Sequence, residues 1–358
     1  MASPSGPSRD DPLVARLSEV AGGPLGDRAG RHPWWTPVRV VLVLTGVTLA
    51  AGMLSKGACV QNEWGDGDRA FAELCWTELA DLSTTRGTTP AWASYVDLSP
   101  SLLAVLLAPL ALLGAWLVTT TRPTARCGAG RWAGAAWAVS PVLLTQWLSW
   151  ELIAAAALAG LLWTAARGQW LLAGACTAIA AACSPWAVRS PLAVDIGSWW
   201  LVVEQRRNVA VSSAVVAVVL VVSLLAVAAA LAVLARSGRL TLAAGLTLGL
   251  VALVLVAPSG PPEVALLLLP GAALAVRRWR DLLAWQACEV VSWAITGWYL
   301  GGVLAPSTGG DATTYWAAVG IRTIGLLWLA GAVLWRDPPT DSSGERQEMT
   351  TRSNAVAV

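Results

Sequence analysis

The sequence has little charge, one lysine and a single histidine. Charged residues make up 13% of the 358 residues, against roughly 25% in a typical soluble domain. A soluble chain of this size needs polar residues to cover its core, so this composition argues against a soluble protein. The lone His32 excludes a Ser-His-Asp arrangement and an HExxH zinc site. The glycines of 128–134 follow no strand and have the wrong spacing for a dinucleotide-binding loop.

Long apolar runs dominate what is present, since 56% of the residues are hydrophobic. A helix needs about 20 apolar residues to cross the hydrocarbon core of a bilayer, where its backbone must satisfy its own hydrogen bonds. The runs therefore predict an all-α, polytopic transmembrane bundle of about ten spans. They cover 38–54, 100–119, 133–148, 150–166, 169–187, 209–235, 240–257, 263–276, 282–304 and 313–335. Because 133–148 and 263–276 are short and flanked by proline, the expected range is eight to ten.

The domain organisation follows from these runs. Residues 38–336 form the predicted membrane domain, and the polar segments 1–37 and 337–358 are predicted to be disordered tails. Arginines in alternate short loops predict that both termini are cytoplasmic, in a multi-pass protein of the inner (cytoplasmic) membrane. Many of the 22 tryptophans fall at the predicted membrane boundaries, where an indole ring is favoured.

The segment 55–99 is the one long polar insertion on the predicted outer face. It carries seven acids, Glu63, Asp66, Asp68, Glu73, Glu78, Asp81 and Asp97. A 45-residue insertion is longer than a connector needs to be, which favours a functional loop, although the acids also fit a solvated cap. Cys59 and Cys75 lie together on this oxidising side and predict a disulfide, which would contribute about 3 kcal/mol in the chain-entropy model.

Two further features involve charge near the membrane. Helical spacing of apolar residues over about 193–208 predicts an interfacial helix on the outer face, with Arg206 and Arg207 at the level of a lipid phosphate. A surface helix with solvated charges is the alternative. Glu289 and Arg322 fall inside predicted spans at similar depth, and we expect an intramembrane ion pair because a lone charge there is costly. Glu151 opens a span at its outer end.

Several segments, in order along the chain, resemble actinobacterial glycosyltransferase family 87, a family of polytopic C-type glycosyltransferases. They are 55–59 (SKGAC), 75–79 (CWTEL), 139–143 (VSPVL), 150–154 (WELIA) and 278–290 (RWRDLLAWQACEV). The last segment is the most specific, and the resemblance covers roughly residues 40 to 337.

The resemblance implies an enzyme that transfers a sugar, of mannose or arabinose type, from a polyprenyl-phosphate donor to a glycolipid or glycan acceptor of the cell envelope. By analogy, Glu78 or Asp97 would act as the general base, with Asp68 as a weaker candidate. Arg189, Arg206 and Arg207 would approach the donor phosphate. The expected partners are membrane lipids, the donor and the acceptor, without nucleic acid. No cofactor is required, although the loop carboxylates are compatible with a divalent metal.

The chain also departs from the family pattern. Glu78 replaces the family's aspartate, and the segment 183–186 (CSPW) lacks a lysine that the family carries there. Loss of a cation opposite a phosphate leaving group would be costly. A catalytically degenerate member that acts as a membrane scaffold or lipid-binding protein is therefore an alternative, and a transporter is a second one.

Overall fold

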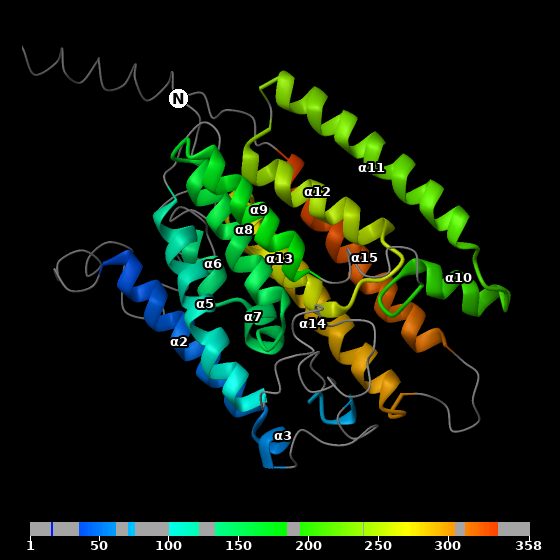
Figure 1. The fold of residues 1–358 in the computed structure, drawn as a ribbon. Helices are drawn as coiled ribbons and strands as arrows, with labels where there is room; N and C mark the ends of the chain where they lie inside the picture. Colours follow the sequence, from blue (N-terminus) through cyan, green and yellow to red (C-terminus); the bar gives the residue numbers. More distant parts are fainter. Residues whose placement is uncertain are drawn as a thin grey trace, which may run out of the picture.

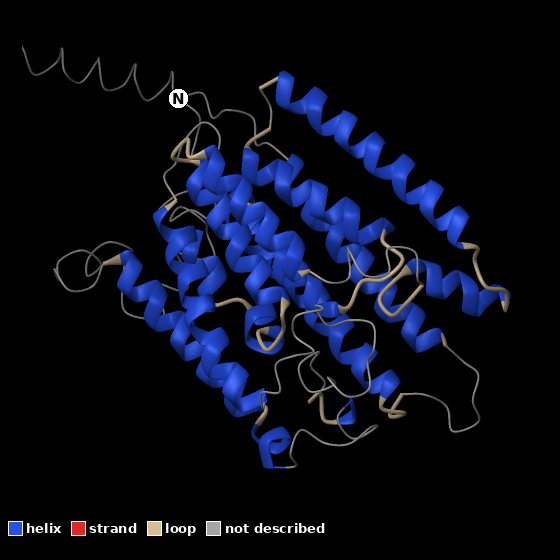
Figure 2. Ribbon diagram, viewed as in Figure 1, coloured by secondary structure: helices blue, strands red, loops and turns tan. Residues whose placement is uncertain are grey.

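The computed structural model of the chain describes residues 16, 36–61, 71–75, 100–121, 133–184, 194–238, 240–304 and 312–335, and these are helical with short connections (Figure 2). The prediction of an all-helical chain is confirmed for these residues. The elements are α2 (Pro37–Ser55), α3 (Gly57–Gln61), α5 (Pro100–Thr120), α6 (Ala133–Ala138), α7 (Pro141–Gln146), α8 (Glu151–Ala165), α9 (Trp170–Cys183), α10 (Trp199–Arg207), α11 (Ser213–Arg236), α12 (Leu242–Val256), η3 (Pro262–Val264), α13 (Ala265–Ala275), α14 (Trp279–Leu300) and α15 (Thr313–Leu334).

Side-chain caps define where several of these helices begin. The hydroxyl of Thr36 accepts a hydrogen bond from the backbone N–H of Arg39, and Pro37 follows at the first helical position. Ser198, Ser212 and Thr241 cap α10, α11 and α12 in the same way. A capping hydroxyl satisfies one of the backbone N–H groups that the first turn leaves open, so the sequence itself sets these helix starts.

The helices form a bundle around α13 (Figure 1). Every residue of α13 is buried, and it packs against α8 and α12. Gly271 allows the approach of α12, because a Cβ at this position would lie 2.5 Å from the hydroxyl of Thr247. At the edge of the bundle, α11 contacts α12, and Val216 is the one α11 residue that is buried in the described structure. The other faces of α11 are apolar and exposed, as expected for a helix that meets lipid.

Among the described residues, four helices are long and apolar enough to cross a membrane: Pro37–Ser55, Leu102–Thr120, Ser213–Arg236 and Thr313–Leu334. Four further apolar helices are shorter, at Glu151–Ala165, Trp170–Cys183, Leu242–Val256 and Pro262–Ala275. These features fit a membrane protein. The count of about ten spans remains a prediction, since the described helices of full spanning length are fewer.

The predicted elements differ from the structure in two places. The run 133–148 is divided into α6 and α7, because Ser140 has extended backbone angles and caps the second helix. The interfacial helix expected from about residue 193 begins only at Trp199, after Gly197 adopts a φ of 81°. In both places a residue outside the helical region of φ/ψ space interrupts an apolar pattern that is otherwise continuous.

Candidate functional site

Five acidic or basic side chains from different parts of the chain are buried in the described bundle. We call them the buried charged cluster: Lys56, Glu151, Glu263, Glu289 and Arg322, each no more than 3% exposed. Glu263 interacts electrostatically with Lys56, Arg322 and Glu151, and Glu289 joins the cluster through Arg322. Buried charges are costly unless they are paired, and in membrane proteins such groups commonly mark functional sites.

Arg322, in the middle of α15, forms the most extensive contacts of the cluster. Its Nε lies 3.2 Å from Oε2 of Glu289 on α14, which is the ion pair expected from the sequence. Its two terminal nitrogens donate to the backbone carbonyls of Gly260 and Pro261, the latter at 3.2 Å. Oε1 of Glu289 also accepts a hydrogen bond of 3.1 Å from the indole of Trp285. The pair is therefore held by hydrogen bonds on both sides.

The carbonyls that hold Arg322 belong to an irregular segment, 257–261, which crosses the loop before α10. The N–H of Gly260 donates to the carbonyl of Ile196, and the N–H of Asp195 donates to the carbonyl of Pro258. A Cβ at Gly197 would lie 1.9 Å from the carbonyl oxygen of Gly260, so only glycine allows this crossing. The N–H of Gly197 also donates to the hydroxyl of Tyr315 on α15, at 2.9 Å. The crossing thus joins α10, η3 and α15 around the guanidinium.

Lys56 lies just beyond the end of α2 and contacts two other parts of the chain. Its ammonium donates to the carbonyl of Leu74, at 3.1 Å, and lies 5.5 Å from the ring centre of Trp293 on α14. Burial lowers the pKa of Lys56 from 10.5 to about 8, while the charge of Glu263 offsets part of this decrease. The only lysine of the chain is therefore a buried cation that loses its proton as pH rises through about 8.

A disulfide holds the segment that Lys56 contacts. Cys59 and Cys75 are joined, and this is the pair expected from the sequence. Leu74 has a φ of 54°, an uncommon conformation for a bulky residue, and its side chain lies against Gly297 of α14. The disulfide thus fixes 71–75 against the end of α14, where its carbonyl meets Lys56.

The carboxylates of the cluster leave polar atoms without partners. Oε2 of Glu151 accepts a hydrogen bond of 2.8 Å from Ser184, at the end of α9. Within the described structure, Oε1 of Glu151, Oε2 of Glu263 and both amide atoms of Gln146 and Gln286 are buried without a hydrogen-bond partner. Buried polar groups are normally hydrogen-bonded, so these unpartnered atoms require an explanation, and a polar binding site would provide one.

The remaining predicted site residues are placed as follows. Glu78, Asp97, Asp68 and Arg189 lie outside the described residues. Arg206 and Arg207 are exposed in the last turn of α10, and no interaction in the described structure joins either of them to the buried charged cluster.

The sequence predicts Glu289 and Arg322 within spans and Glu151 at the outer end of one, but it indicates no role for Lys56 or Glu263. Signals for both were present. Lys56 is the only lysine in a chain that otherwise uses arginine, and Glu263 opens an apolar run directly after two prolines. Neither signal shows that the two side chains meet, because more than 200 residues separate them.

Within the described residues, no group of three or more His, Cys, Asp or Glu side chains is arranged to hold a metal ion. Comparisons of the chain with protein-family models, curated proteins and solved structures find no match.

Proposed function

We propose that the protein is a membrane glycosyltransferase, which transfers a sugar from a polyprenyl-phosphate donor to a cell-envelope acceptor on the outer face. The acceptor hydroxyl would attack the anomeric carbon, and the bond from that carbon to the phosphate oxygen would break. The hydroxyl proton would pass to a loop carboxylate, with Glu78, Asp97 and Asp68 as the candidates. Polyprenyl phosphate would leave with the electron pair.

The buried ammonium of Lys56 is the observation that carries this proposal. A phosphate leaving group develops negative charge, and a cation in a site of low polarity stabilises that charge far better than one in water. Lys56 lies at the start of the acidic loop and beside the disulfide-linked segment 71–75. It therefore supplies a cation at the end of the bundle where the sequence resemblance expects transfer, although 183–186 lacks a lysine.

The unpartnered carboxylate and amide atoms support the same proposal. Sugars are recognised mainly through hydroxyl groups, which both donate and accept hydrogen bonds, and Gln146 and Gln286 can do both in return. Arg189, Arg206 and Arg207 remain the proposed contacts of the donor phosphate, since a guanidinium forms two parallel hydrogen bonds with it.

A transfer assay tests the proposal directly. Purified protein in lipid bilayers is given a radiolabelled polyprenyl-phosphate sugar and a membrane extract as the source of acceptor. The wild type should produce labelled product. The transfer rate of Lys56→Ala should be at least 100-fold lower. If Glu78 or Asp97 is the general base, Glu78→Gln or Asp97→Asn should lower the rate by a similar factor. Full activity of Lys56→Ala would remove the proposed role of the lysine.

Transport is the second candidate, because the irregular segment 257–261 binds Arg322 through backbone carbonyls inside the bundle. Broken helices and buried charges of this kind also line transporter sites. Transport would be favoured if the assay shows no sugar transfer, and if the protein takes up a solute and Glu263→Gln abolishes that uptake. Absence of both activities would favour the scaffold or lipid-binding alternative.

A further inference from the structure

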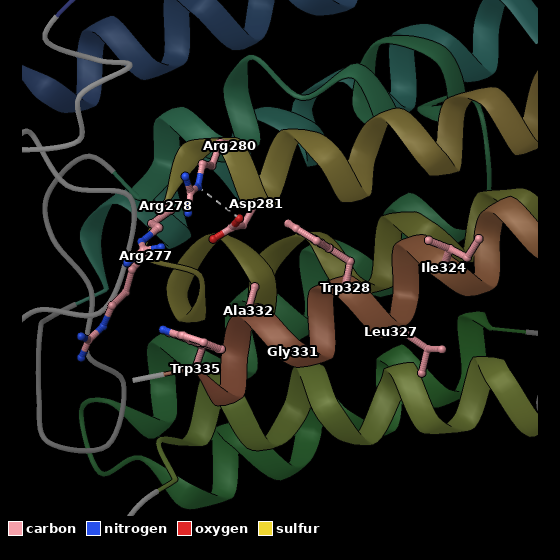
Figure 3. Close-up of a pocket in the computed structure, with 10 residues that line it drawn as sticks. All are labelled: Arg277, Arg278, Arg280, Asp281, Ile324, Leu327, Trp328, Gly331, Ala332 and Trp335. Atoms are coloured by element: carbon pink, nitrogen blue, oxygen red, sulfur yellow. Dashed lines mark ion pairs between the residues drawn. The ribbon is translucent and has the colours of Figure 1, made fainter. Parts of the chain in front are cut away.

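A second site lies at the other end of α14, about 21 Å along the helix from Trp293, given 1.5 Å per residue from Trp279. A pocket of about 560 Å³ opens between the start of α14 and the end of α15. Figure 3 shows its two unlike sides, with arginines gathered at the start of α14 and apolar residues along α15. It shares no residue with the buried charged cluster.

One side of the pocket is strongly basic. Arg277, Arg278 and Arg280 line it, together with one acid, Asp281. Nε of Arg280 lies 3.6 Å from that carboxylate, but its side chain is 68% exposed, so the pair is a weak surface contact. Among the lining residues that the structure describes, three guanidiniums and one carboxylate give a net positive charge, and the N-terminal peptide dipoles of α14 add to it. The chemistry of this side fits a phosphate group.

The other side is apolar and unusually exposed. Ile324, Leu327 and Trp328 share one face of α15 and are each more than half exposed, and Trp335 is 71% exposed. Gly331 lies between Trp328 and Trp335 along α15, and a Cβ built there would meet no atom of another element within 4 Å. We call this open space beside Gly331 the notch. α15 is one of the four described helices that are long and apolar enough to cross a membrane, so its exposed face is suited to contact hydrocarbon.

We propose that this pocket binds an anionic glycerophospholipid, with its phosphate on the arginines and an acyl chain in the notch at Gly331. A soluble anion would use the basic side alone and would leave the apolar wall uncovered. A phospholipid uses both, because its headgroup lies at the membrane surface directly above its chains. Basic pockets between transmembrane helices commonly bind such lipids. The orientation predicted from the arginines places the site in the inner leaflet, and the inference does not depend on the proposed sugar transfer.

Native mass spectrometry and thermal shift of the full chain, with phosphatidylglycerol, phosphatidylcholine or a polyprenyl phosphate added, test the proposal. Phosphatidylglycerol should bind in preference to phosphatidylcholine. The double variant Arg277→Gln/Arg280→Gln should lose this affinity at least tenfold. Arg39→Gln/Arg236→Gln is the control, because it removes two exposed arginines from other helix ends without touching the pocket.

A steric variant separates pocket binding from general attraction to charge. Gly331→Phe should fill the notch without disturbing the packing of α15, and should weaken phosphatidylglycerol binding while every arginine is kept. By contrast, a Cβ at Gly325 would lie 2.6 Å from Cβ of Cys288, so that glycine is needed for the contact with α14. Equal binding of the two phospholipids, tighter binding of the polyprenyl phosphate, or unchanged binding in the Arg277/Arg280 and Gly331 variants would overturn the proposal.

Discussion

Lys56 shows how much the surroundings of one residue change its chemistry. In the sequence it is a single lysine at the start of a polar loop, where it would stay charged up to pH 10. In the structure Lys56 is 3% exposed; its ammonium contacts Leu74 and Trp293 and interacts with the charge of Glu263. The pKa of about 8 that results brings its titration into an accessible range.

The first prediction concerns the pH dependence of transfer. As pH rises through about 8, the folded protein loses the Lys56 proton, so activity that needs this charge should fall. The Lys56→Arg variant keeps its charge and should stay active to higher pH, whatever its rate at neutral pH. Initial rates between pH 6 and pH 10 measure this, and identical profiles for both proteins would contradict it.

Stability should change in the opposite direction over the same range. The unfolded chain holds the Lys56 proton up to its ordinary pKa of 10.5, whereas the folded chain releases it near 8. The unfolded state therefore binds more protons between these values, and the contribution of Lys56 to stability increases with pH there. A profile in which activity falls while the Tm is maintained would separate loss of charge from unfolding.

The second prediction concerns the pair Glu289 and Arg322. Replacement of Arg322 by Met should destabilise the protein by about 3 to 5 kcal/mol, because it leaves a buried carboxylate and two backbone carbonyls without their partner. The double variant Glu289→Met/Arg322→Met should recover part of that loss. Thermal unfolding in detergent measures both, and additive losses in the double variant would show that the pair is not coupled.

At the scale of elements, the crossing between 194–198 and 257–261 holds the bundle together around Arg322. Neither segment is helical, and each supplies backbone hydrogen bonds to the other. The approach depends on Gly197, which has a φ of 81° and no room for a Cβ. Loops usually tolerate substitution with little loss of stability. At Gly197, by contrast, we expect substitution to destabilise the fold.

The third prediction follows from that contact. Gly197→Ala should lower stability by about 2 to 4 kcal/mol, since it combines a disfavoured φ with a collision against the carbonyl of Gly260. Gly168→Ala is the matched control, because Gly168 also has a positive φ, 76°, but its Cβ would meet nothing within 4 Å. Thermal unfolding should show a small loss for the control and a large one for Gly197→Ala. Equal losses would mean that backbone strain alone matters.

At the scale of the whole molecule, α11 offers a test of orientation. Its 24 residues span about 36 Å, enough to place its two ends on opposite membrane faces. Both flanking segments are exposed, at Val209 before the helix and at Ser237 after it.

The fourth prediction uses these two positions. A membrane-impermeant thiol reagent added to intact cells should label Val209→Cys and leave Ser237→Cys unlabelled until the cells are lysed. The four cysteines outside the disulfide, Cys127, Cys176, Cys183 and Cys288, are replaced by serine in this background while the disulfide is kept. The reverse pattern would place the Lys56 end of the bundle in the cytoplasm, and sugar transfer on the outer face would then be excluded.

The sequence by itself determined the helical class, most helix positions and the pairs Cys59–Cys75 and Glu289–Arg322. Each of these depends on local periodicity, on a capping residue or on the high cost of an unpaired charge at a given depth. It also suggested candidate acids of the outer loop, which lie outside the described residues.

Only the tertiary structure decided which distant residues share one site. Lys56 interacts electrostatically with Glu263 and lies 5.5 Å from the ring centre of Trp293 on α14, and no local pattern encodes that arrangement. The lipid pocket likewise requires the start of α14 to meet the end of α15. Hydrophobic periodicity shows that a helix has an apolar face but not which helix covers it, because the hydrophobic effect and lipid contact are both non-directional.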